Sequence, residues 1–164
     1  MDSPPSGLTT LLARLAASGT DFVLVGALAA VAQGAPLTTV DVDVVHRRGP
    51  DNVDRLLGFL ASIDARYRGR PPGQVLRPNR QALLGVGHQL FTTNLGPLDV
   101  LGAVEGGRGY DDLVHESIAI EVEGERVKVL GLRMLAELKR GATSVKDRMS
   151  LAVLEDTLRR TAGG

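Results

Sequence analysis

Apolar residues recur at helical spacing in four segments of the chain: near the amino terminus, in residues 49–65, and twice in the last third. The apolar positions are Leu8, Leu11, Leu12 and Leu15 in the first segment, Val53, Leu56, Leu57 and Leu60 in the second, and Leu132, Leu135 and Leu138 followed by Leu151, Leu154 and Leu158 in the last two. A spacing of three and four residues puts such side chains on one face, so each segment is predicted to be a helix with one buried face. Gly19 ends the first helix, Pro50 and Asp51 begin the second, and a break near Gly141 separates the last two.

Short runs rich in β-branched and aliphatic residues predict strands between these helices. The runs are DFVLVG (21–26), TVDVDVV (39–45), HQLFTTNL (88–95), LDVLGAV (98–104) and IAIEVEGERVKVL (118–130). The last run is predicted to be a hairpin that turns at Glu123, Gly124 and Glu125, and the dipeptide GP at 96–97 is predicted to join the third and fourth runs.

Two stretches complete the pattern. Residues 27–34, ALAAVAQG, favour a helix that stops at Gly34, whereas residues 68–87, rich in Arg, Pro, Gly and Gln, are predicted to form a loop with one short strand. The predicted fold class is therefore α+β, with a mixed β-sheet flanked by helices and a helical carboxyl-terminal part. A length of 164 residues favours one domain over residues 1–164.

Composition narrows the function classes. The 19 basic residues balance the 19 acidic ones, which argues against a protein whose whole surface binds a polyanion. The absence of cysteine excludes disulfides and thiolate metal sites, so any metal ligand must be oxygen or imidazole. The longest apolar run, residues 22–32, is shorter than the roughly 20 residues that span a bilayer, and no signal peptide is visible. We therefore expect a cytoplasmic protein with no membrane partner.

Two aspartates, Asp41 and Asp43, alternate with valines in the second predicted strand. In a strand, Val40, Val42 and Val44 would share one face and the two carboxylates the other, roughly 6.5 Å apart. Carboxylates that close repel each other unless water or a cation screens them, and Mg²⁺ commonly takes one or two protein carboxylates together with phosphate oxygens. The pattern indicates a magnesium site, with a solvated strand face as the alternative interpretation.

A third aspartate, Asp99, stands between Leu98 and Val100 in another predicted strand, where an unpaired carboxylate is costly. If this strand lies beside the one with Asp41 and Asp43, three carboxylates converge, and two divalent ions held there could polarise a triphosphate and activate a hydroxyl. Asp99 would then accept the proton of that hydroxyl or hold the metal. The alternative is a strand-end aspartate that faces water.

Gly26 follows the first predicted strand and precedes a helix, so its backbone could approach a phosphate. The surrounding sequence is neither a Walker A loop nor G-x-G-x-x-G, and taken by itself the position favours a glycine that simply turns the chain.

In combination, these motifs resemble the minimal nucleotidyltransferases of the DNA polymerase β superfamily. The shared order is a strand, Gly26-Ala27, a small-residue helix, T-x-D-x-D at residues 39–43, and LDVL around Asp99. Residues 110–155 are similar to the carboxyl-terminal part of the AbiEii-like branch, in which a hairpin precedes L-x-x-L-x-x-x-K and then K-D-x-x-D-L-x-x-L. The resemblance covers residues 22–158 and implies a catalytic core at about 20–105, followed by the hairpin and carboxyl-terminal helices at 106–160.

The resemblance implies Mg²⁺-dependent transfer of a nucleoside monophosphate from an NTP to a hydroxyl, with two ions and three groups of site residues. These are Gly26 and Ala27 at the triphosphate, Asp41, Asp43 and Asp99 at the metal, and Lys139, Lys146 and Asp147 near the nucleotide. Ordinary solvated charges on helix surfaces are the alternative for the last three. The implied partners are an NTP, a tRNA or protein acceptor, and an antitoxin, since proteins of this branch often act as toxins of toxin–antitoxin pairs.

Three positions depart from the family pattern. Ala27 replaces a glycine or serine, Leu37 stands where an arginine is usual, and Ser150 stands where the late motif has an aspartate. These departures support a second hypothesis, a catalytically decayed binding module that acts through protein contacts. A metal phosphodiesterase is a third hypothesis, which the lack of histidine ligands disfavours.

The histidines and the arginine-rich string carry less information. His46, His88 and His115 have no metal-ligand spacing and are predicted to be incidental, although His88 adjoins the predicted loop. The string RYRGRPP at 66–72 could contact RNA or a nucleotide, and a solvated loop explains it as readily.

Overall fold

A mixed β-sheet organises the chain in the computed structural model, which describes residues 6–162. Within these residues the sheet has seven strands in the order β3-β4-β5-β2-β1-β7-β6. The strands are β1 (Phe22–Val25), β2 (Val42–His46), β3 (Arg66–Tyr67), β4 (His88–Thr93), β5 (Gly96–Leu101), β6 (Ser117–Val122) and β7 (Glu125–Leu130). The pairs β1–β7 and β2–β5 are parallel and the other neighbours are antiparallel, so the predicted mixed sheet is confirmed.

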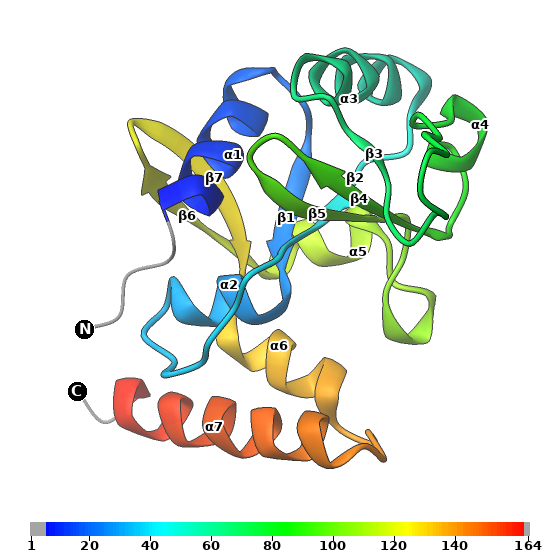
Figure 1. Cartoon of the computed structure of the whole chain (residues 1–164). Helices are drawn as coiled ribbons and strands as arrows, with labels where there is room; N and C mark the ends of the chain where they lie inside the picture. Colours follow the sequence, from blue (N-terminus) through cyan, green and yellow to red (C-terminus); the bar gives the residue numbers. More distant parts are fainter. Residues whose placement is uncertain (1–5, 163–164) are drawn as a thin grey trace.

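Helices lie on both sides of this sheet and beyond one of its ends (Figure 1). They are α1 (Ser6–Ala17), α2 (Gly26–Val31), α3 (Pro50–Ser62), α4 (Arg80–Leu83), α5 (Tyr110–Leu113), α6 (Leu132–Lys139) and α7 (Val145–Ala162). The chain enters α2 directly from β1 and α6 almost directly from β7, and these two parallel strands end on the same side. As a result α2 and α6 lie together there, with α7 packed against α6 (Figure 1).

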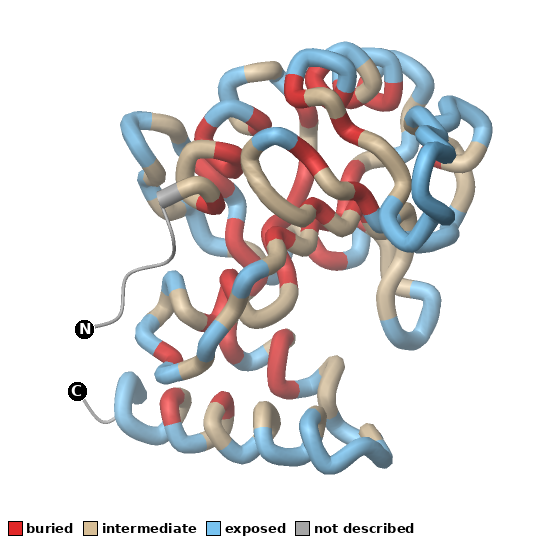
Figure 2. Tube along the Cα trace, in the orientation of Figure 1, coloured by how far each residue is buried: buried red, intermediate tan, exposed pale blue. Residues whose placement is uncertain are grey.

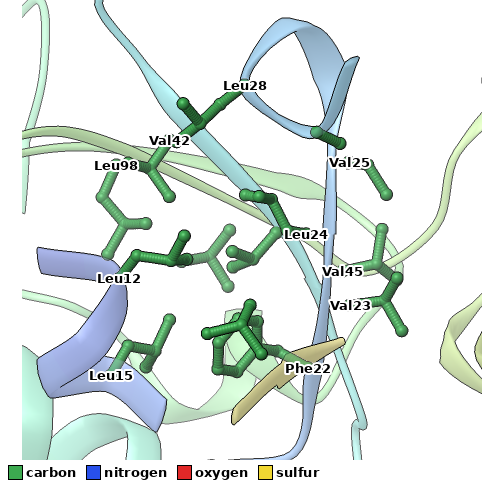
Figure 3. Packing of buried hydrophobic residues seen from close by; sticks show 14 of the residues in the cluster. Leu12, Leu15, Phe22, Val23, Leu24, Val25, Leu28, Val42, Val45 and Leu98 are labelled. Atoms are coloured by element: carbon green, nitrogen blue, oxygen red, sulfur yellow. The ribbon is translucent and has the colours of Figure 1, made fainter. Parts of the chain in front are cut away.

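The central strands are buried on both faces, as expected for short apolar runs without alternation. One face, which includes Phe22, Leu24 and Leu98, meets Leu12 and Leu15 of α1 (Figure 3). On the opposite face lie the buried valines Val23, Val25 and Val45. Buried positions concentrate along the sheet and on the inward side of the helices, whereas the outer side of α7 is exposed (Figure 2). The leucine spacing that predicted α1, α3, α6 and α7 therefore identified their buried faces correctly.

The second predicted strand was placed too early in the sequence. β2 begins at Val42, so Asp41 precedes the strand and Val40 is 65% exposed, in place of sharing a buried face with Val42 and Val44. The Thr39 hydroxyl donates to the Asp41 carbonyl oxygen (3.1 Å), a local turn that competes with strand pairing. Because β2 pairs with β1 only from Asp43 onward, residues 39–41 have no neighbour on that side to extend the ladder.

Three further boundaries differ from the sequence prediction. The region 68–87 contains the short helix α4 and no strand, because the Asn79 side chain accepts from the Ala82 N–H and caps a helical turn. The connection between β4 and β5 is Asn94-Leu95, and the dipeptide at 96–97 belongs to β5. Helix α2 ends at Val31, three residues before the predicted stop at Gly34.

No helix in the described part of the chain (residues 6–162) combines the length and the apolar character that crossing a membrane requires.

Candidate active site

Two predicted metal-binding aspartates lie side by side in the sheet. β2 runs parallel to β5 with Asp43 opposite Asp99, and antiparallel to β1 with Asp43 opposite Val25. Residues paired across neighbouring strands project to the same face, and neighbouring strands are about 4.8 Å apart. The sheet therefore brings the two carboxylates together on one face, next to the residue that precedes Gly26.

Gly26 forms the turn from β1 into α2 and packs directly against Asp43. Its φ of +73° lies in the left-handed region, which favours glycine. A Cβ at this position would also overlap Oδ2 of Asp43. Glycine is thus required for two separate reasons, the backbone conformation and the close approach of a carboxylate.

The ionised form of Asp43 is disfavoured in the folded protein. Burial, the neighbouring charge of Asp99 and the more distant Asp41 raise the pKa of Asp43 to about 7, although Arg68 opposes the shift. The buried Oδ1 of Asp43 has no hydrogen-bond partner within residues 6–162. A buried carboxylate oxygen without a partner, next to a second carboxylate, is an arrangement that a bound cation would stabilise.

Arg68 binds the other carboxylate of the pair, and sequence reasoning had not identified this role. Its Nη2 donates to Asp99 Oδ1 (2.8 Å) and to the Phe91 carbonyl oxygen (2.8 Å). Only the pairing of β3 with β4 brings Arg68 to Asp99. The sequence gives no local signal for that pairing, because β3 is two residues long and lies in a region that reads as a loop.

We expect the stability of the metal-free protein to depend on pH through Asp43. Unfolded aspartate has a pKa of 3.8, whereas the pKa of Asp43 in the folded state is about 7. Between these values only the folded state retains the proton, so this group's contribution to the free energy of unfolding decreases as pH rises, by at most about 1.4 kcal/mol per pH unit. Above pH 7 the Asp43→Asn protein should therefore be more stable than wild type in chemical denaturation.

His46 makes the Asn variant necessary as a reference. Burial lowers the pKa of His46, although hydrogen bonding of its ring to the Leu83 and Leu101 carbonyl oxygens, which can only accept, opposes the shift. Its contribution to stability is therefore lost as pH falls below about 6.5. This trend opposes that of Asp43 in the same window. Subtracting the Asp43→Asn curve from the wild-type curve isolates Asp43, and a difference that stays constant from pH 5 to pH 8 would contradict the shifted pKa.

A cavity of about 410 Å³ opens beside this pair, between the sheet end and helices α6 and α7. Seven of the eight predicted site residues line it: Gly26, Ala27, Asp41, Asp43, Lys139, Lys146 and Asp147. Asp99 is the eighth, adjacent to the lining residue Asp43 and covered by Arg68. Residues far apart in the sequence are thus gathered around one space, which is large enough for a nucleotide-sized ligand.

The remaining wall of the cavity is mainly aliphatic, with Thr38, Thr39 and Glu105 among its polar residues, and it includes two further positions that depart from the family pattern. Leu37 and Ser150 both line it, so an alkyl chain and a hydroxyl stand where the resemblance implies an arginine and an aspartate. His88 also lines the cavity, and its Nε2 donates to the Ala103 carbonyl oxygen (2.9 Å). His46 is buried and His115 is exposed on the surface, so the three histidines do not converge.

Lys139 and Asp147 form an ion pair that joins α6 to α7. The Lys139 ammonium donates to Asp147 Oδ1 (2.9 Å), and this bond is the main reason why the pKa of Asp147 lies below its ordinary value. Ser144 adds to the effect at the start of α7, where its hydroxyl also accepts from the Asp147 N–H. Both charged side chains are about 40% exposed, so the pair can open toward a ligand in the cavity at small cost.

The donor set fits a divalent cation held by two carboxylates. Among residues 6–162 there is no group of three or more His, Asp or Glu side chains placed to hold a metal ion, because Asp41 lies outside β2. Asp43 and Asp99 together offer carboxylate oxygens, and two carboxylates are the usual protein share for Mg²⁺ when phosphate oxygens and water complete its shell. The unpartnered Oδ1 of Asp43 is consistent with such a site.

The fold is shared with solved nucleotidyltransferase structures. The crystal structure of TM1012 from Thermotoga maritima, a protein provisionally assigned as a nucleotidyltransferase, matches with a TM-score of 0.53 and 15% sequence identity, over 95% of this chain and 90% of that one. The solution structure of the antibiotic-resistance factor ANT(2'')-Ia matches with a TM-score of 0.55 and 12% identity, over 92% and 84% of the two chains. At these identities the comparison establishes the fold, which is the one that the resemblance implied.

Sequence comparisons add nothing to this result, because no protein-family model and no curated protein matches the chain significantly.

Proposed function

We propose that the protein is a Mg²⁺-dependent nucleotidyltransferase that moves a nucleoside monophosphate from an NTP to a hydroxyl group. One observation carries this proposal: Asp43 and Asp99 stand in register on one face of the sheet, with a buried Asp43 oxygen left unpartnered, beside a glycine turn that opens into the cavity. The shared fold of the nucleotidyltransferase structures supports the same reaction class.

In this proposal each cavity residue has a defined task. The Gly26 turn lets the backbone approach the triphosphate, and Lys139 and Lys146 supply positive charge to its phosphate oxygens. Asp43 and Asp99 would hold Mg²⁺, with Asp41 at the rim of the site. Bound Mg²⁺ would neutralise the triphosphate and stabilise the charge that develops during transfer.

The reaction itself needs little covalent participation from the protein. The acceptor oxygen forms a bond to the α-phosphorus, the bond from that phosphorus to the bridging oxygen breaks, and pyrophosphate leaves. The acceptor hydroxyl gives up its proton, and the Asp99 carboxylate is the group proposed to accept it. The aliphatic wall of the cavity limits water around the triphosphate, so that transfer is favoured over hydrolysis.

The acceptor and the biological setting follow from the AbiEii-like resemblance. We propose a hydroxyl of RNA, such as a tRNA end, or of a protein as the acceptor, and a cytoplasmic toxin that is held in check by an antitoxin as the setting.

Label transfer tests the proposed reaction directly. The protein is incubated with each of the four α-labelled NTPs, with Mg²⁺ or Mn²⁺, and with total tRNA or cell extract, and labelled products are separated by gel. We expect one nucleotide to give a labelled RNA or protein band that requires the divalent ion. Absence of label with all four nucleotides and both ions would refute the proposal.

A catalytically decayed binding module is the second candidate, and specific observations favour it. Arg68 forms an ion pair with Asp99, and Lys139 forms one with Asp147, so the predicted site residues among them already have partners. At the cavity, Leu37 and Ser150 stand where the family pattern has charged residues. Such a module would bind NTP without transferring its nucleotide. Thermal shift reports NTP binding in either case, since ligand at 100 times its Kd adds about 2.7 kcal/mol of stability. A thermal shift without label transfer would therefore identify the binding module.

A further inference from the structure

Arg68 forms an ion pair with Asp99, one of the two carboxylates of the candidate cation site. Its side chain and that of Asp99 are 34% and 18% exposed, so the ion pair lies at the edge of the solvent and not in the core. The Arg68 backbone N–H donates to the Leu90 carbonyl oxygen (2.9 Å), which fixes the residue to β4 at the point where the chain leaves the sheet. The next residues, 69–77, are all exposed.

The guanidinium and a divalent cation would compete for the same oxygen. Nη2 of Arg68 lies 2.8 Å from Oδ1 of Asp99, so it takes one acceptor position of that oxygen and places a positive charge next to any cation bound to this carboxylate. Asp43, the neighbour of Asp99, has its own Oδ1 unpartnered and can receive a cation without competition. Binding of a cation to both carboxylates is therefore opposed while Arg68 stays at Asp99, because two positive groups at one carboxylate repel each other.

We propose that Arg68 is an exchangeable counter-ion of Asp99, which holds this carboxylate in the metal-free protein and releases it when nucleotide and cation enter together. The nucleotide brings the phosphate oxygens that complete the cation's ligand shell, and it offers the released guanidinium a new anionic partner in a geometry that arginine binds well. This coupling makes stable cation binding depend on the nucleotide. The inference rests on the proposed function for the identity of the nucleotide, whereas the competition at Asp99 can be measured with the metal alone.

Exchange is physically feasible because little holds the side chain besides two hydrogen bonds. Partly exposed ion pairs contribute little to stability, so the loss of the Asp99 contact is readily offset by a new phosphate contact. Arg70, two residues further along, donates to the Gln74 side chain and has no contact with Asp99. It provides a matched control with the same charge in the same segment.

Mn²⁺ binding to the full-length protein tests the inference, measured by electron paramagnetic resonance with and without a non-hydrolysable ATP analogue. Arg68→Gln should bind Mn²⁺ alone about 10-fold more tightly than wild type, since a competing positive charge is removed. Arg68→Lys should fall between the two, because lysine keeps the positive charge but lacks the planar guanidinium that binds a carboxylate in a fixed geometry. Arg70→Gln should match wild type. The analogue should tighten Mn²⁺ binding in wild type and do so less in Arg68→Gln.

Several results would overturn the inference. Equal or weaker Mn²⁺ binding by Arg68→Gln would show that Arg68 does not compete for Asp99. If Arg70→Gln tightened Mn²⁺ binding as much as Arg68→Gln, the gain would come from the lower net positive charge and not from the contact with Asp99. If Arg68→Gln fails to fold by circular dichroism, Arg68→Lys decides the question by the same criterion. Failure of the proposed function is distinguishable: wild type then shows no label transfer in the earlier assay, whatever the Mn²⁺ affinities are.

Discussion

Replacement of Asp43 by alanine is expected to reduce nucleotidyl transfer by about 1,000-fold or more while the protein remains folded. Asp43 is the central carboxylate of the site: it faces Asp99 across β2 and β5, it contacts the Gly26 turn, and its Oδ1 is buried without a partner. Its removal leaves Asp99 as the remaining strand carboxylate for a cation. The loss is measured as kcat/KM in the label-transfer assay at saturating Mg²⁺.

Two companion variants give this prediction its specificity. Asp51→Ala removes an exposed carboxylate at the start of α3, away from the cavity, and should retain wild-type transfer. Asp41→Ala should cause a smaller loss than Asp43→Ala, because Asp41 precedes the strand and only borders the pair. Near-wild-type activity of Asp43→Ala, with its fold confirmed by circular dichroism, would show that transfer does not require the carboxylate pair of Asp43 and Asp99.

Substitution of Gly26 by alanine should produce the second-largest effect. The new Cβ would meet Oδ2 of Asp43, so the carboxylate has to turn away from its present position. A displacement of about 1 Å in a catalytic group can lower the rate about 100-fold, and we expect a loss of that size in kcat together with weaker Mn²⁺ binding. The left-handed backbone adds a cost of about 1–2 kcal/mol in stability.

Gly34→Ala separates the two parts of this effect. Gly34 also has a positive φ, +97°, but an added Cβ there would meet no atom within 4 Å. Both variants should lose stability in urea denaturation through the left-handed backbone, with an added loss in Gly26→Ala from the overlap with Asp43. Only Gly26→Ala should lose transfer and cation binding. Equal activity losses in the two variants would mean that backbone strain, and not the contact with Asp43, accounts for the result.

The elements that sequence analysis located correctly are those whose signal is local. The leucine spacing of α1 and α3 defined their buried faces, and Glu123-Gly124, with φ of +47° and +84°, form the turn of the predicted hairpin. The errors lie where a local preference competes with a distant partner. Val40 has the pattern of a buried strand residue, yet no neighbouring strand reaches it, and the Thr39 turn prevails.

In the candidate site, too, local signals identified the residues, whereas contacts between distant segments decided how they are arranged. Asp43 was a candidate because it shares a predicted strand face with Asp41, and Asp99 because a carboxylate between Leu98 and Val100 is costly. Their contact required β2 and β5 to pair, which sequence analysis stated only as a condition. Lys139, Lys146 and Asp147 entered through family resemblance, and the packing of α6 on α7 is what turns them toward the cavity. In the sequence, Arg68 is one of several arginines in a stretch predicted to be a loop. The pairing of β3 with β4 places it next to Asp99.

By itself, the sequence determined which segments bury a face, that the sheet is mixed, and which side chains could bind a cation or a phosphate, because hydrophobic spacing and side-chain chemistry act over a few neighbouring residues. Only the tertiary structure decided that Asp43 stands beside Asp99, that Arg68 holds Asp99, and that Asp41 lies outside the strand. Those contacts depend on strand register, and register is fixed by the simultaneous packing of segments that are distant in the chain.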